Sequence, residues 1–151
     1  MINGYIPAAR FLPFLSWTDV AALPDKSNTV IVLPTGAIEQ HGPHLPCSVD
    51  SVISSGVAGH ALARLPATIP AYAIPPIVYG KSEEHLHFPG TVTLSGDTLL
   101  HTLLEIAESL YRAGFRKLLM INGHGGQPQI LQIACREMRL RHGDFIAIPH
   151  D

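Results

Sequence analysis

Val30-Ile31-Val32-Leu33 is a short β-branched run that predicts a buried strand, and it leads into the polar stretch Glu39-Gln40-His41-Gly42-Pro43-His44. Gly42 and Pro43 are poorly suited to a helix interior, so we expect this stretch to form a loop. Glu39 and His41 place a carboxylate and an imidazole two residues apart, and the carboxylate of Asp50 follows. Oxygen and nitrogen donors of this kind hold hard and borderline divalent cations. The stretch therefore predicts a strand that ends in a loop able to hold functional groups.

Strands and helices alternate along the rest of the chain. We expect further strands at residues 74–79, 91–94, 118–121 and 145–148, and helices at 50–65, 97–113 and 130–142. Asp97 is the expected N-cap of the second helix, Gly114 follows its end, and Pro128 suits a first helical turn. This alternation implies crossover connections and a mainly parallel sheet. Because the last expected strand is followed by few residues, it either closes one edge of a small sheet or belongs to a longer fold.

Composition excludes several classes of protein. A length of 151 residues suits one domain, and a hydrophobic content of 46% argues against disorder. The net charge of −2 and the lack of a basic stripe argue against nucleic-acid binding. No apolar stretch is long enough to cross a membrane and no clean leader precedes the first strand, so a cytoplasmic location is the default. The low charged fraction of 15% is compatible with a surface partly covered by other subunits.

A second glycine-rich segment, Asn122-Gly123-His124-Gly125-Gly126, directly follows the expected strand at 118–121. Two alternatives are a solvated histidine on a turn and a phosphate-binding turn at a helix N-terminus. The segment matches neither the Gly-x-Gly-x-x-Gly pattern nor the P-loop pattern of nucleotide-binding proteins. Ligands of open parallel sheets bind beyond the carboxyl ends of the strands. Since this segment and the Glu39 loop both follow such ends, we expect Glu39, His41 and His124 to share one rim. Asp50 would point back to them, unless it serves as the N-cap of its helix.

The segments closely resemble the creatininase family, also called creatinine amidohydrolases. The resemblance runs from about Trp17 to the end, and it is strongest at Leu33 to Pro46, Asp50, Phe88-Pro89-Gly90-Thr91 and Asn122 to Gly126. It implies a three-layer α/β/α fold with a mainly parallel sheet. We therefore expect residues 1–151 to form a single creatininase-like α/β domain that lacks the C-terminal part of the fold.

The resemblance also implies a site with two divalent metal ions per subunit, zinc or manganese, with iron as a further candidate. Glu39, Asp50 and His124 would hold one ion, and His41 and Asp50 the other, so that Asp50 bridges them. A hydroxide between the ions would attack the amide carbon of a small, creatinine-like cyclic or linear amide. Some members carry a glutamate two residues after the histidine equivalent to His124, where this chain has Gly126. The groups for proton transfer are expected in the C-terminal part, so no catalytic acid or base is assigned here.

Further expectations concern the substrate and the assembly. By resemblance, the loop that carries Glu84 and His85 approaches the site, and these two residues are the candidate substrate contacts; a solvated charged loop is the alternative. Family members form homo-oligomers, often hexamers. Two other functions stay open: a truncated, non-catalytic relative that keeps partial metal binding, and a phosphate-binding sugar or nucleotide enzyme built on the glycine-rich turn.

Overall fold

Four parallel strands form one sheet in the computed structural model, which describes residues 2–151. The strands are β1 (Val30–Thr35), β2 (Ala71–Ala73), β3 (Lys117–Asn122) and β4 (Ile146–His150). Their order across the sheet is β2-β1-β3-β4, and each neighbouring pair is parallel. The predicted parallel sheet is therefore confirmed.

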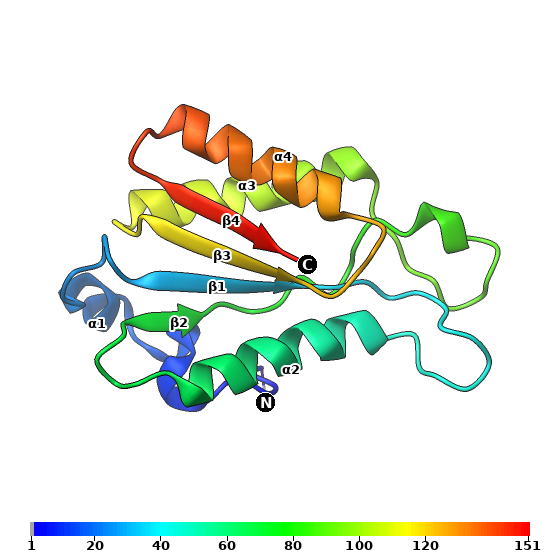
Figure 1. Cartoon of the computed structure of the whole chain (residues 1–151), viewed down its shortest axis with the longest axis horizontal. Coiled ribbons are helices and arrows are strands. Elements are labelled where there is room, and N and C mark those ends of the chain that lie inside the picture. Colours follow the sequence, from blue (N-terminus) through cyan, green and yellow to red (C-terminus); the bar gives the residue numbers. More distant parts are fainter. Residues whose placement is uncertain (1) are drawn as a thin grey trace.

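Helices cover both faces of this sheet. Helix α2 (Val49–Arg64) lies on one face, and α3 (Gly96–Arg112) and α4 (Pro128–Arg141) lie on the other (Figure 1). Successive side chains of a strand point to opposite faces of the sheet. Ile31 and Met120 therefore belong to the core beneath α3 and α4, whereas Val32 belongs to the core beside α2. The expected three-layer α/β/α arrangement is confirmed. Within residues 2–151, no helix has both the length and the apolar character required to cross a bilayer.

Two of the predicted strands were wrong. The second strand lies at Ala71–Ala73 rather than at residues 74–79, because Pro75 and Pro76 have no N–H group to donate to a neighbouring strand. Only Ile77 in that range forms an isolated bridge, to Thr35. The expected strand at 91–94 is reduced to one antiparallel bridge between Val92 and Ile38.

Of the three predicted residues at helix ends, Asp97 was wrong, and Gly114 and Pro128 were confirmed. Asp97 is not the N-cap of α3, because the hydroxyl of Ser95 accepts the N–H of Thr98 instead. Gly114 follows α3 with a φ of +100°, as expected, and Pro128 begins α4. The short helix α1 (Trp17–Ala22) was not predicted, since six residues are too few to show a period. Residues 2–151 also contain three short 3-10 helices, at Ala8–Arg10, Leu12–Phe14 and Glu83–His85.

The sheet order places the loops after β1 and β3 at a topological switch point. From β1 the chain crosses to β2 on one side, and it later returns to place β3 on the other side. Thr35 and Asn122, the last residues of β1 and β3, are paired in register. The loops that follow therefore leave the same rim of the sheet, which is where open parallel sheets bind ligands.

Two glycines let helix α2 begin close against these loops. A Cβ atom on Gly36 would lie 2.5 Å from the Cα of Ser51, and one on Gly123 would clash with the carbonyl of Asp50. Side chains at either position would push away the first turn of α2. The absence of these side chains brings Asp50 to the rim shared by β1 and β3.

Arg10 ties the N-terminal segment to the connection between α2 and β2. Its Nη1 donates to the carbonyls of Ile69, at 2.8 Å, and Ala71, at 3.3 Å. Its Nη2 donates to Pro66, at 2.9 Å, and more weakly to Leu65. One guanidinium thus satisfies several carbonyls that follow the end of the helix.

Replacing Arg10 by alanine should lower the free energy of unfolding by about 1–2 kcal/mol, because charge-assisted hydrogen bonds to these carbonyls are lost. Arg64→Ala is the matched control, since Arg64 donates to the carbonyl of His60 within its own helix. Urea denaturation of the two variants measures the difference. Equal midpoints for both would show that the Arg10 contacts add no stability.

Candidate metal centre

The carboxylate of Asp50 lies at the middle of the candidate site. Asp50 is buried in the first turn of α2, where the positive end of the helix dipole favours a negative charge. Its Oδ1 lies 2.9 Å from Nε2 of His41, and its Oδ2 lies 2.8 Å from Nδ1 of His124. The alternative that Asp50 caps the helix is wrong, because Ser48 occupies the N-cap position. Its carboxylate is directed at the two imidazoles instead.

Glu39 adds a second buried carboxylate to the same cluster. Its Oε1 lies 3.2 Å from Nδ1 of His124, and its Oε2 accepts a hydrogen bond from the hydroxyl of Ser82. The N–H of Glu39 donates to the carbonyl of Cys47 at 3.0 Å, which holds the two ends of the polar loop together. Glu39 and His41 from the loop after β1, Asp50 from α2 and His124 from the loop after β3 therefore converge, as expected from the sequence.

Both histidines are held in the orientation of a metal ligand. Nδ1 of His41 donates to the carbonyl of Glu39 at 3.2 Å, and Nε2 of His124 donates to the carbonyl of Lys81 at 2.8 Å. A carbonyl only accepts, so these nitrogens carry the ring protons. The other nitrogen of each neutral ring then presents a lone pair toward a carboxylate, an arrangement that a cation or an additional proton must neutralise.

The pKa of His124 reflects this need for positive charge. Burial of the ring lowers its pKa, but its interactions with Asp50, the Lys81 carbonyl and Glu39 together outweigh burial and raise the pKa above its ordinary value. Without a metal, a proton on Nδ1 stabilises the two carboxylates. A divalent cation would compete with that proton for the same nitrogen.

The donor atoms fit a divalent cation. While His124 is neutral with its proton on Nε2, the buried Oδ2 of Asp50 accepts no hydrogen bond from any of residues 2–151. This is costly for a charged oxygen unless a cation or an added proton on His124 satisfies it. Glu39, His41 and Asp50 each offer one donor atom within 4.8 Å of the others, and so do Glu39, Glu84 and His124. Imidazole and carboxylate ligands suit zinc, manganese and iron.

The loop with Glu84 and His85 reaches the edge of this cluster. Nε2 of His85 lies 3.8 Å from Oε2 of Glu39, and its Nδ1 lies 3.3 Å from the amide nitrogen of Gln40. Glu84 joins one of the two donor groups while remaining exposed. The loop is therefore placed against the site, and the expected substrate contacts of Glu84 and His85 stay a prediction.

Two supporting residues were missed by the sequence analysis. Ser82 is fully buried and bonds Glu39, but its charged neighbours Lys81 and Glu83 suggested an exposed loop. Gln127 is also buried; its amide donates to Asn122 at 3.0 Å and Gly36 at 3.3 Å and accepts the N–H of Lys81 at 3.2 Å. A polar residue directly before Pro128 was the only signal for Gln127. Together they join the three loops that surround the metal ligands.

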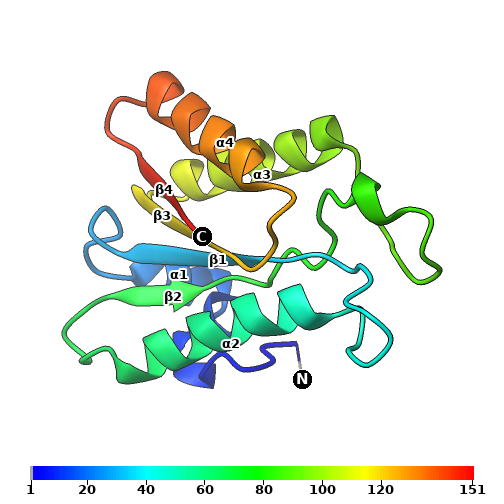
Figure 2. The ribbon, with the colours of Figure 1, turned by 45° about the vertical axis from the view of Figure 1, so that its right-hand side comes forward.

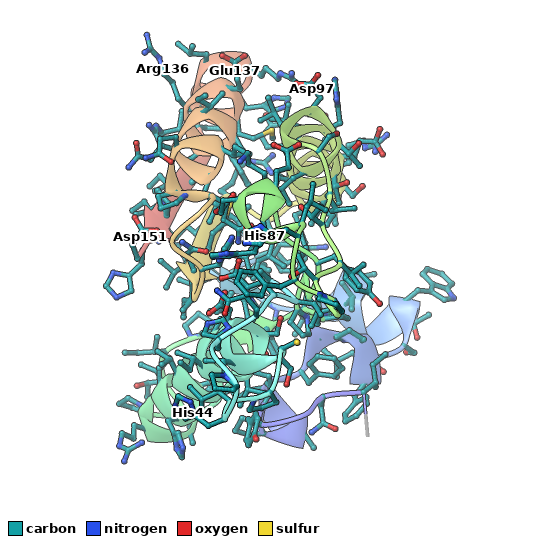
Figure 3. The ribbon with its side chains drawn as sticks, turned by 90° about the vertical axis from the view of Figure 1, so that its right-hand side faces the viewer. His44, His87, Asp97, Arg136, Glu137 and Asp151 are labelled. Carbon is teal, nitrogen blue, oxygen red and sulfur yellow. The ribbon has the colours of Figure 1, made fainter. Side chains whose placement is uncertain are left out.

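Figure 3 looks onto the rim where the strands end. In this view His87 lies in front of the middle of the rim, whereas His44 lies over the α2 side of the molecule. His44 is exposed and belongs to neither group of donor atoms. Asp97 lies at the outer helix α3, away from the cluster. It therefore provides a control position for substitutions of an aspartate.

Comparison with known proteins identifies relatives of this fold and site. The family model described as creatininase, creatinine amidohydrolase, matches residues 13–150. A mycofactocin precursor peptide peptidase of Mycolicibacterium smegmatis is 37% identical over 122 residues, which cover 80% of this chain and 49% of the relative. A creatinine amidohydrolase of Pseudomonas putida is 34% identical over 138 residues, covering 85% of this chain and 52% of the relative.

Solved structures agree with these matches. A manganese creatininase superposes with a TM-score of 0.80 at 33% identity. The match covers 94% of this chain and 58% of the creatininase chain. A zinc–zinc form of a creatininase variant gives a TM-score of 0.79 at 31% identity, covering 93% of this chain and 57% of its own. The chain thus spans about half the length of the curated relatives it matches.

The raised pKa of His124 predicts an unusual pH dependence for the metal-free protein. The pKa of His124 is higher in the folded protein than in the unfolded chain, where it is about 6.5. Its proton therefore stabilises the fold fully at a pH below about 6.5, and this stability is lost as the pH rises through the folded-state pKa. The melting temperature of chelator-treated protein should therefore fall over that range. Saturating zinc should remove the fall, because the cation replaces the proton.

The matched variants are His124→Asn, which should flatten this part of the pH profile, and His101→Asn, which alters an exposed ring on α3 and should preserve it. Thermal melts from about pH 6 to pH 9 measure both. A metal-free profile that is the same in wild type and His124→Asn would contradict the role of the His124 proton.

Proposed function

The chain belongs to the creatininase family, and we propose that it acts as a metal-dependent amidohydrolase on a C–N bond of a small cyclic or linear amide. The observation that carries the proposal is the buried Asp50 carboxylate, which lies between one nitrogen of His41 and one of His124. With both rings neutral, its Oδ2 has no hydrogen-bond donor among residues 2–151. A site built only for structural stability would pair this oxygen with an N–H or O–H group. The names of the two curated relatives, a peptidase and an amidohydrolase, support hydrolysis of an amide.

We assign Glu39, Asp50 and His124 to one divalent cation, and His41 and Asp50 to a second. Zinc or manganese is supported by the names of the solved relatives, and iron also suits these donors. When bound, two such cations lower the pKa of a coordinated water and polarise the amide carbonyl. The chain itself supplies the negative charge of Glu39 and Asp50 and fixes the tautomers of both histidines.

A groove next to the cluster provides room for a substrate. It has a volume of about 300 Å³, which lies at the small end of the range for ligand sites. One of its lining residues is Gln40, the direct neighbour of Glu39 in the sequence. The lining residues are Gln40, Gly42, Pro43, Cys47, Phe88 and Pro89. The hydrogen-bonding distance between His85 and Gln40 places an imidazole beside this groove, where it could donate to an amide oxygen. We therefore propose His85 as a substrate contact.

The groove suits either a small amide or the end of a peptide, which are the two substrate classes suggested by the names of the relatives. The small amide is our first choice because of the limited volume. A homo-oligomer, hexameric by resemblance to the family, a cytoplasmic location and a single domain for residues 1–151 stay predictions.

Metal analysis of the purified protein tests the proposal. About two divalent ions per chain are expected, and Asp50→Asn should lose most of both, because the variant removes the charge between the two histidines. Asp97→Asn, an exposed aspartate on α3, should keep the wild-type metal content. Ring opening of creatinine to an open-chain carboxylate, and release of amine from linear small amides and short peptides, should follow metal content across the three proteins.

The outcomes separate the alternatives. Metal loss in Asp50→Asn without hydrolysis by the wild type would support a non-catalytic relative that binds metal. A wild-type protein with no more metal than Asp50→Asn would contradict the proposed centre itself.

A further inference from the structure

Gly126 leaves a space beside His124 that a carboxylate of another loop fills. A Cβ atom built on Gly126 would clash with Oε1 of Glu84 and would lie 2.5 Å from Nε2 of His124. Oε1 of Glu84 therefore occupies the volume in which a side chain at position 126 would begin. Any larger residue there would displace the Glu84 carboxylate from the His124 ring.

The two oxygens of Glu84 have different surroundings. Oε2 lies 3.5 Å from Nζ of Lys81 and forms an ion pair with it. Oε1 faces Gly126 and the His124 side of the site. One donor atom each from Glu39, Glu84 and His124 lies within 4.8 Å of the other two, which is the spacing of ligands around one cation. Lys81 thus orients the Glu84 side chain so that one oxygen is available to a metal.

The buried oxygen of Asp50 is an independent sign that a cation belongs at this cluster. Oδ2 lies 2.8 Å from Nδ1 of His124 and, with that ring neutral and its proton on Nε2, accepts no hydrogen bond from residues 2–151. Two buried carboxylates and two histidines hold the interior side of the centre. On the solvent side, Glu84 is the carboxylate that the structure places against Glu39 and His124.

We propose that Glu84 is a metal ligand, supplied by the loop around Glu83–His85 through the space above Gly126. The inference rests on the proposed metal centre and changes the role of Glu84 from substrate contact to ligand. It also gives this loop a second function, because a bound cation would fix the loop against the groove that we assign to the substrate. The neighbouring Glu83 pairs with Lys81 at 3.4 Å and belongs to neither donor group.

Glu84→Gln and Glu83→Gln form a matched pair, since both remove one exposed carboxylate from the same 3-10 helix and both lose an ion pair with Lys81. Cobalt(II) is a suitable probe, because its visible absorption reports the number and type of its ligands. Affinity can be measured by competition with a chelator of known strength. Loss of a supporting residue around a metal typically costs about 10–100-fold in affinity, so loss of a ligand should weaken cobalt at least tenfold.

We expect Glu84→Gln to weaken cobalt binding and to change its spectrum, whereas Glu83→Gln should match the wild type in both. Far-UV circular dichroism and melting of the metal-free proteins should be the same for the pair. If Glu84→Gln binds cobalt with the affinity and spectrum of Glu83→Gln, while Asp50→Asn loses it, Glu84 is not a ligand and the proposed centre survives. If the wild type itself fails to bind cobalt, the proposed function fails together with this inference.

Discussion

The site depends on one electrostatic constraint: the buried carboxylate of Asp50 must be neutralised by bound cations or by an added proton on a neighbouring histidine. Each of its oxygens lies within 3 Å of an imidazole nitrogen, and each imidazole donates its proton elsewhere, to a backbone carbonyl. An uncompensated buried charge costs several kcal/mol. A proton on His124 meets this cost in part, and divalent cations meet it more completely.

The fold creates this constraint through backbone geometry (Figure 2). Parallel pairing of Thr35 with Asn122 brings the ends of β1 and β3 together, so that two loops from distant parts of the chain leave the same rim. Gly36 and Gly123 then allow α2 to begin against both loops, with its dipole directed at the cluster. Ser82 and Gln127 fix the surrounding loops by hydrogen bonds. Ligand placement therefore follows from sheet register and helix position.

The sequence predicted most of this arrangement because its strongest signals are local. The apolar run at Val30 and the periodic apolar residues of α3 identify buried elements, and Glu39, His41 and His124 stand next to strand ends. The position of β2 was wrong, since its three residues depend on pairing with β1 rather than on a pattern of their own. Ser82 and Gln127 were missed because their burial results from loop packing. The space above Gly126 depends on the three-dimensional position of Glu84 and has no local signal.

Anomalous diffraction from crystals soaked with zinc or manganese, recorded at the edge of that metal, can locate cations at Asp50. We expect strong peaks within bonding distance of Asp50, one of them shared with Glu39 and His124 and another with His41. A peak bonded to Glu39 and His124 but not to Asp50 would contradict the central place of that carboxylate. Soaked crystals without any peak at Asp50, and with Oδ2 bonded instead to an ordered water or a rearranged N–H group, would contradict the metal centre.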